Sequence, residues 1–243
     1  MIKLSVCCCT YNRPHLLGEL IASFQMQTYP KEHCELIVLD DAGQYGDLRG
    51  DNWQIVSFPR RFASLGEKRN ACMSLASPEC GYFVVADDDD IYFPWWLETH
   101  ARNFERGALW SAADWFYESV DNGSVYKKYY GIEGHPNNAY SKQLFWEVGG
   151  YPPLSGWEDQ CLYEKFRNKR LAFSNALDEK TLPFLLYRRF TTEKHLSCIP
   201  LEEYQDARHF TPVLEHATLE IGWRHDYLAK IYEYEERENP KRQ

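Results

Sequence analysis

Short apolar runs alternate with segments of helical periodicity over the first third of the chain. Four runs have the length and apolar character of buried strands, and they cover residues 3–9, 35–39, 53–58 and 82–86. Helices are expected after the first run, where Pro14 suits an opening turn and Leu16, Leu20 and Phe24 share a face, and over 65–75. This alternation predicts an α/β fold with a Rossmann-like, mostly parallel sheet flanked by helices.

Polar or acidic clusters follow the first, second and fourth predicted strands, at residues 10–13, 40–41 and 87–90. Ligands of open α/β sheets bind at the carboxyl ends of the strands, so these clusters are expected to form one site. The chain has no G-x-G-x-x-G after the first strand and no G-x-x-x-x-G-K-[ST], so neither a dinucleotide fold nor a P-loop is supported.

The second half of the chain has a different pattern. Dense aromatic residues and frequent turn signals over 110–153 predict short strands in a looser region, and 160–168 has helical periodicity. A polar helix is expected after Pro200, with one apolar face formed by Leu214, Ala217, Ile221, Leu228 and Ile231. We therefore expect a catalytic domain over 1–198 and a C-terminal helical extension over 199–243. The extension would dock on that domain or on a second copy of the chain, giving a homo-oligomer.

Composition narrows the class of protein. The chain has 243 residues and a formal net charge of −9. This charge counts against a general nucleic-acid-binding protein, because such a protein would present a basic binding surface. It has no apolar stretch of the ~20 residues that a transmembrane helix requires, and its start lacks the features of a secretory leader. The eight cysteines form no C-x-x-C pair and are expected to be small buried side chains in a reducing compartment, which predicts a cytoplasmic protein.

The four consecutive aspartates Asp87–Asp90 come directly after an apolar strand. Placed partly buried at a sheet edge, they repel one another and need a cation, and carboxylate oxygens suit Mg²⁺ or Mn²⁺. A metal held by few carboxylates leaves positions for substrate phosphates, which points to chemistry on a nucleoside diphosphate compound. A solvated acidic turn or helix cap is the alternative.

A second acidic pair, Glu158-Asp159, opens the helical stretch of 160–168. The helix dipole favours an ionised carboxylate there, and such a carboxylate in a cleft can act as a general base toward a hydroxyl. Spacing alone favours an ordinary pair of helix-start acids.

Six blocks of the sequence together resemble the family 2 glycosyltransferases of the GT-A fold, and they occur in the family's order over about residues 3–170. The blocks are Ser5-Val6 through Thr10-Tyr11-Asn12-Arg13-Pro14, Gln27-Thr28-Tyr29-Pro30 with Glu35 through Asp40-Asp41, Arg69-Asn70, Asp87–Asp90 with Ile91 and Pro94, Gly149-Gly150-Tyr151, and Glu158-Asp159. The resemblance implies an inverting glycosyltransferase that uses a sugar nucleotide, with a UDP-sugar favoured, and Mn²⁺ or Mg²⁺.

The resemblance also implies roles for individual residues. Thr10 and Asp41 would line the nucleoside pocket, with Tyr11, Asn12, Arg13 and Asp40 close by, and Arg69 would reach the donor's phosphates or ribose. Asp89 would be the main metal ligand, with Asp87 and Asp88 on the ribose or supporting the metal, although four aspartates leave the register of the D-x-D motif open by one residue. Asp159 would be the catalytic base, and Glu158 its neighbour on the acceptor side.

Two further residues have two interpretations each. His195 would be a metal or phosphate contact or an ordinary surface histidine, and Trp157 would stack on an acceptor sugar or serve packing. The acceptor itself stays open among a glycan, a lipid-linked sugar, a protein and a modified nucleic-acid base.

Two rival functions are weighed against glycosyl transfer. One is an aspartyl phosphatase or phosphotransferase, but its nucleophile would follow the first strand, which ends in Thr10-Tyr11 and not in aspartates. The other is a sugar-nucleotide-binding protein without catalysis, against which the pairing of Asp159 with the aspartate cluster argues.

Overall fold

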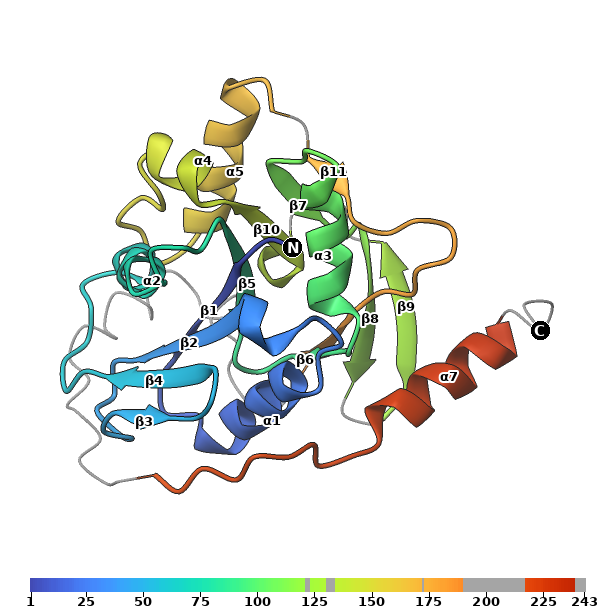
Figure 1. Cartoon of the computed structure of the whole chain (residues 1–243). Coiled ribbons are helices and arrows are strands. Elements are labelled where there is room, and N and C mark those ends of the chain that lie inside the picture. Colours follow the sequence, from blue (N-terminus) through green and yellow to red (C-terminus); the bar gives the residue numbers. More distant parts are fainter. Residues whose placement is uncertain (121–122, 130–133, 172, 190–216, 239–243) are drawn as a thin grey trace.

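The computed structural model describes residues 1–120, 123–129, 134–171, 173–189 and 217–238 (Figure 1). Its centre is a parallel array formed by β1 (Leu4–Thr10), β2 (Cys34–Asp40), β4 (Trp53–Ser57) and β5 (Tyr82–Asp87). The four strands agree with the four predicted runs to within a residue or two. β3 (Leu48–Arg49) pairs antiparallel with β4 at one edge, and the 3-10 turn η1 (Lys31–His33) leads into β2.

Beyond β5 the large sheet becomes mixed. Its order is β11-β7-β10-β5-β1-β2-β4-β3, in which β10 (Asn138–Ser141) runs antiparallel to β5 and to β7 (Trp110–Ala112). β11 (Ser174–Asn175) extends this edge in parallel with β7. The prediction of a mostly parallel sheet is therefore right for the first half of the chain, where α1 (Pro14–Gln25) lies between β1 and β2 and α2 (Leu65–Ser74) lies between β4 and β5.

Helices cover both faces of this sheet. One face packs against α1 (Pro14–Gln25) and α3 (Trp96–Glu105), and the other against α2 (Leu65–Ser74), α4 (Lys142–Glu147) and α5 (Glu158–Asn168). The consecutive cysteines of β1 follow the alternation of a strand, because Cys8 belongs to the first core and Cys7 to the second. Side chains on opposite faces of the sheet cannot converge on one metal.

A smaller sheet has the order β6-β12-β8-β9, formed by β6 (Ile91–Tyr92), β12 (Leu185–Arg189), β8 (Trp115–Val120) and β9 (Val125–Tyr129). β6 begins immediately after the aspartate cluster, so Asp87–Asp90 join the end of β5 in the large sheet to the small sheet. This junction fixes both ends of the acidic loop.

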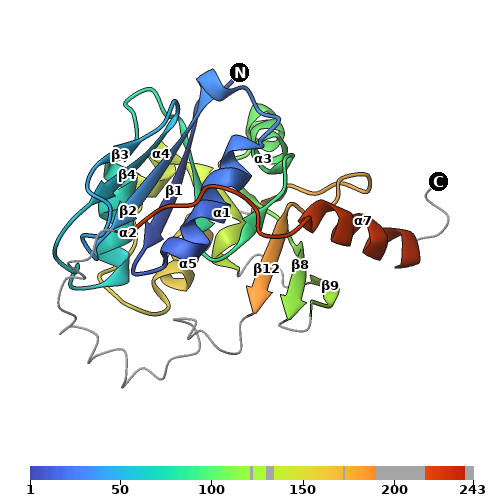
Figure 2. The ribbon, with the colours of Figure 1, turned by 90° about the horizontal axis from the view of Figure 1, so that it is seen from below.

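The predicted C-terminal helix is wrong in its extent. Residues 217–226 form no helix, and Ile221 is exposed. The helix α7 (Tyr227–Glu238) begins only after Asp226. Asp226 caps this helix by accepting the backbone N–H of Ala229 at 3.0 Å. Leu214 lies outside the described residues. The stretch ahead of α7 runs across α1, and α7 lies against the small sheet beside β9 (Figure 2). No helix in the described ranges is long and apolar enough to span a membrane.

Candidate active site

The three predicted clusters meet at the carboxyl ends of β1, β2 and β5. Parallel pairing places Thr10 beside Asp40 and Cys9 beside Asp87. The Thr10 hydroxyl donates to Asp88 Oδ2 at 2.6 Å, and Lys68 Nζ donates to the Thr10 carbonyl at 2.6 Å and to Asp41 Oδ1 at 2.5 Å. The side chains of Thr10, Asp41, Lys68 and Asp88 are buried, and their contacts bring the three clusters together at one edge of the sheet.

Asp40 shapes the turn that follows β2. Its carboxylate accepts the backbone N–H groups of Ala42 at 2.8 Å and Gln44 at 2.9 Å and the Ser57 hydroxyl at 2.6 Å. The side chain is completely buried, so its oxygens are used within the protein. Asp40 therefore acts on this corner of the site by positioning Asp41.

Asp41 and Tyr11 share one cation. Arg61 Nη1 lies 3.1 Å from Asp41 Oδ1, and its guanidinium carbon lies 3.8 Å from the centroid of the Tyr11 ring. Asn12 follows in the left-handed region with φ of 53°, and its Oδ1 accepts from Gln44 Nε2 at 3.1 Å. The predicted nucleoside residues thus form one corner of the site.

Arg13 bridges two of the four aspartates. Its Nη1 lies 2.9 Å from Asp88 Oδ1 and 2.9 Å from Asp89 Oδ2. The two carboxylate side chains are only 5% and 9% exposed, against 20% for the arginine. A positively charged nitrogen therefore occupies the point between the two oxygens.

Burial and mutual repulsion disfavour the ionised forms of Asp89 and Asp90. Burial and the neighbouring Asp88 raise the pKa of Asp89 to about 7, against the opposing charge of Arg13. Burial and the charge of Asp89 also raise the pKa of Asp90, although Asp90 Oδ1 accepts the backbone N–H of Arg188 at 3.0 Å. A further cation near Asp89 would relieve this repulsion.

The residues present fit a divalent metal. Hard carboxylate oxygens suit Mg²⁺ or Mn²⁺, and the Arg13 nitrogen marks a point where a cation lies between two of them. Within the described ranges, no three His, Cys, Asp or Glu side chains converge on one point. A metal here would accordingly be held by about two carboxylates, with substrate oxygens and water completing its coordination.

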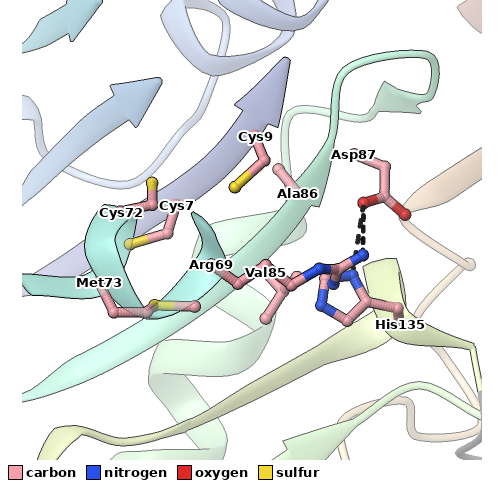
Figure 3. Close-up of a pocket in the computed structure, with 9 residues that line it drawn as sticks. All are labelled: Cys7, Cys9, Arg69, Cys72, Met73, Val85, Ala86, Asp87 and His135. Atoms are coloured by element: carbon pink, nitrogen blue, oxygen red, sulfur yellow. Dashed lines mark ion pairs between the residues drawn. The ribbon is translucent and has the colours of Figure 1, made fainter. Parts of the chain in front are cut away.

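Asp87 faces a different group of side chains (Figure 3). Its Oδ1 lies 3.4 Å from His135 Nδ1 and 3.8 Å from Arg69 Nη2, in a small pocket between β1, β5 and α2. Burial opposes the ionisation of Asp87, but His135 and Arg69 outweigh it and hold its pKa below the ordinary range. The structure thus pairs Asp89 with Asp88 across the Arg13 guanidinium, whereas Asp87 faces His135 and Arg69. The sequence had treated Asp87 and Asp88 alike, as residues that contact the ribose or support a metal on Asp89.

Arg69 connects the aspartate cluster with the second acidic pair. Its Nε lies 3.3 Å from Glu158 Oε1, while its Nη2 faces Asp87. Glu158 is 3% exposed, and the adjacent Asp159 is half-buried and accepts the backbone N–H of Gln160 at 2.8 Å. The sequence predicted that Arg69 would reach the donor's phosphates or ribose; here it holds the start of α5 beside the end of β5.

Asn70 holds the turn that leads toward α5. Its Nδ2 donates to the Tyr151 carbonyl at 2.8 Å, and its Oδ1 accepts the Tyr151 N–H at 2.9 Å. Gly150 has φ of +61°, and a Cβ there would lie 2.5 Å from Asn70 Oδ1. The turn therefore requires glycine at this position, which accounts for the second glycine of the predicted motif.

Trp157 stands at the entrance of α5 in a strained conformation. Its φ of 65° is unusual for a bulky residue, and its side chain is 73% exposed, which excludes a role in the core. His195 lies outside the described residues.

Three side chains of the site were missed at the level of sequence. They are Lys68, Arg61 and His135, which contact Asp41, Tyr11 and Asp87 respectively. Lys68 precedes the predicted Arg69-Asn70 pair on the same helix, which was the one signal available. Arg61 lies in an irregular segment, and His135 opens the 3-10 helix η3 (His135–Asn137), which is too short for a periodicity that would indicate the direction of a side chain.

The family model described as glycosyl transferase family 2 matches residues 5–160. No significant match was found among curated proteins.

Several solved structures share the fold. The complex of S. aureus TarS 1–349 with UDP-GlcNAc is 18% identical with a TM-score of 0.65, and the alignment covers 82% of this chain and 62% of that one. The structure of S. aureus TarS 1–349 alone is 19% identical with a TM-score of 0.60, over 77% of this chain and 60% of that one. The mannosyltransferase PcManGT from Pyrobaculum calidifontis, in complex with GDP-Man and Mn²⁺, is 15% identical with a TM-score of 0.55. The alignment covers 77% of this chain and 56% of that one. The chain thus spans about three fifths of the length of these structures.

Proposed function

Since the chain belongs to glycosyl transferase family 2, a family of glycosyltransferase enzymes with the GT-A fold, we propose that it is an inverting, metal-dependent glycosyltransferase. It moves a sugar from a nucleoside-diphosphate sugar to an acceptor hydroxyl. The observation that carries this proposal is the position of Arg69, which lies 3.8 Å from Asp87 on the donor side and 3.3 Å from Glu158 on the acceptor side.

The donor side of the site is assigned to the ends of β1, β2 and β5. Thr10, Tyr11 and Asp41 line the nucleoside pocket, with Asn12 and Asp40 shaping its walls. Asp88 and Asp89 hold the divalent cation, and Asp87 contacts the ribose. The cation supplies positive charge that stabilises the diphosphate as it leaves.

The acceptor side is assigned to the start of α5. Asp159 takes the proton of the acceptor hydroxyl, and the oxygen attacks the anomeric carbon as the bond to the diphosphate breaks. Attack from the side opposite the leaving group inverts the configuration at that carbon. Glu158 is held by Arg69 and keeps the first turn of α5 in place, and Trp157 offers its exposed ring to the acceptor sugar.

A UDP-sugar is the favoured donor. Among the fold relatives, TarS binds UDP-GlcNAc and PcManGT binds GDP-Man with Mn²⁺, and the TarS complex has the higher TM-score, 0.65 against 0.55. Thermal-shift measurements with UDP, GDP and their sugars, each with and without Mn²⁺, test the choice of base. A larger stabilisation by GDP than by UDP would contradict it.

Asp159→Asn tests the catalytic assignment. The amide has nearly the same shape but accepts no proton, so transfer is expected to fall by about 10²–10⁴-fold while donor affinity stays near that of the wild type. Transfer is measured as product formed from a sugar nucleotide, and donor affinity by calorimetry.

Glu164→Gln is the matched control, because Glu164 is an exposed acid on the same helix. It is expected to leave both quantities unchanged. Unchanged transfer in Asp159→Asn would remove Asp159 from the reaction, and a wild type that binds donor without any turnover would favour a binding protein over an enzyme.

A further inference from the structure

Arg13 lies where a metal ion would have to lie. Its Nη1 is 2.9 Å from an oxygen of Asp88 and 2.9 Å from an oxygen of Asp89. A nitrogen hydrogen-bonded to both oxygens fills the space between them, so Arg13 and a metal coordinated by the same two oxygens exclude each other.

We propose that Arg13 is a built-in cation that holds Asp88 and Asp89 together until the metal–diphosphate arrives, and that it then changes partners and binds the diphosphate. This inference rests on the proposed function. The Arg13 guanidinium would bind the two carboxylates before the substrate arrives and the diphosphate afterwards.

The surroundings of Arg13 confine such a movement to its side chain. Its carbonyl accepts the N–H groups of Leu16 and Leu17, each at 3.1 Å, which fixes its backbone to the first turn of α1. The side chain is long and 20% exposed, whereas the carboxylate side chains of Asp88 and Asp89 are 5% and 9% exposed. The guanidinium can therefore leave while the carboxylates stay in place.

Charge explains why the exchange would proceed. A single positive charge balances two close carboxylates only in part, and Thr10 adds a neutral hydrogen bond to Asp88. A divalent cation between the same oxygens repels the guanidinium, and the diphosphate that enters with the cation attracts it. Metal and nucleotide are therefore expected to bind synergistically, whereas the metal alone has to compete with Arg13.

Arg13→Gln tests the exchange with Mn²⁺ alone, titrated against the protein and followed by the electron paramagnetic resonance signal of free Mn²⁺. Without its competitor, Mn²⁺ alone is expected to bind on the order of 10-fold more tightly than to the wild type. UDP binding at saturating Mn²⁺, measured by calorimetry, is expected to weaken by a similar factor. Arg13→Lys retains the positive charge but not the two parallel N–H donors of the guanidinium. Its affinities for Mn²⁺ and for UDP are expected to lie between those of the wild type and those of Arg13→Gln.

Arg61→Gln is the matched control, because Arg61 is a neighbouring cation that contacts Asp41 and Tyr11 instead of the aspartate cluster. Its affinity for Mn²⁺ alone is expected to equal that of the wild type, and the melting temperature of each variant without ligand checks that it is folded.

Unchanged or weaker binding of Mn²⁺ alone in Arg13→Gln would overturn the inference, as would equal tightening in Arg61→Gln, which would indicate a general effect of charge. These outcomes leave the proposed function intact. A wild type that binds no Mn²⁺ even with UDP would contradict the metal dependence of the proposed function, and the inference with it.

Discussion

Buried ion pairs hold the candidate site together at the scale of single residues. Lys68 and Asp41, with side chains 5% and 2% exposed, meet at 2.5 Å, and Lys68 also binds the Thr10 carbonyl at the end of the neighbouring strand. A buried charge that loses a partner is costly, and without Lys68 the Asp41 carboxylate would keep only Arg61 and the backbone N–H of Phe62. Lys68 thus ties the end of β1 to Asp41, which follows β2.

Lys68→Met measures this contribution. The change leaves Asp41 buried and with less compensating charge, and it is expected to lower the free energy of unfolding by about 3–5 kcal/mol, measured by urea denaturation at pH 7. Lys3→Met is the control, since Lys3 lies 3.8 Å from Glu79 with both side chains largely exposed, and it is expected to cost less than about 1 kcal/mol. Equal effects of the two substitutions would contradict a structural role for Lys68.

The location of the site was predictable from the sequence, but the pairing of its side chains was not. Apolar runs followed by Thr10, Asp40-Asp41 and Asp87 are enough to bring those residues to one edge of a parallel sheet. Whether Asp87 or Asp88 joins Asp89 around a cation depends on contacts with Arg13, Arg69 and His135, which come from three other parts of the chain. No local pattern encodes such contacts.

At the scale of elements, the alternation of strand and helix predicted the first half of the large sheet correctly. It missed α3, because aromatic residues and Pro94 obscure the periodicity ahead of that helix, and it did not resolve the antiparallel β7 and β10. Short strands with many aromatic residues, such as those of the small sheet, are defined by their partners more than by their own sequence.

Asn70 joins two elements, α2 and the turn before α5, through two hydrogen bonds to Tyr151. Asn70→Ala is expected to cost about 1–3 kcal/mol of stability, because it leaves backbone groups in the turn unpaired. It is also expected to lower transfer more than donor binding, since it loosens the start of α5, which carries Asp159. Thermal unfolding and the ratio of kcat to donor affinity are the measurements.

Ser74→Ala provides the comparison on the same helix. The Ser74 hydroxyl donates to the Ala71 carbonyl at an exposed position, so its removal is expected to change stability by less than about 0.5 kcal/mol. An Asn70→Ala protein as stable and as active as Ser74→Ala would show that the clamp on Tyr151 has no function.

At the scale of the whole molecule, a buried carboxylate connects the start of the chain to its end. Glu19 of α1 is 1% exposed and lies 2.5 Å from Arg188 Nη1 of β12 and 2.7 Å from Arg224 Nη2, and it accepts the Tyr227 hydroxyl at 2.8 Å. Arg188 Nε also donates to the Asp89 carbonyl at 2.5 Å. The segment before α7 is therefore linked through Glu19 and Arg188 to the acidic loop.

The charge of Glu19 makes stability depend on pH. Burial opposes its ionisation, but hydrogen bonds from Arg224 and the charge of Arg188 outweigh it and lower its pKa from 4.5 to about 2. A lowered pKa contributes stability above pH ~4.5, and that contribution is lost as the pH falls toward 2. Glu19→Gln is thus expected to destabilise the protein by about 3 kcal/mol at pH 7 and by about half of that or less at pH 3.

Urea denaturation of Glu19→Gln and wild type at pH 7 and at pH 3 measures this difference. Glu233→Gln, at an exposed position of α7, is expected to have no effect at either pH. A destabilisation of Glu19→Gln that is the same at both values of pH would show that the ionised form of Glu19 is not what the two arginines stabilise.

Glu19 and Arg224 are separated by 205 residues, which has a consequence for synthesis of the protein. While the chain is still emerging from the ribosome, α1 is complete but the second arginine that neutralises its carboxylate has not been made. The final packing of α1 therefore has to wait until residue 224 has been made, and contacts of such long separation are slow to form. Nascent chains that stall before Arg224 would present an unneutralised α1 to chaperones and proteases.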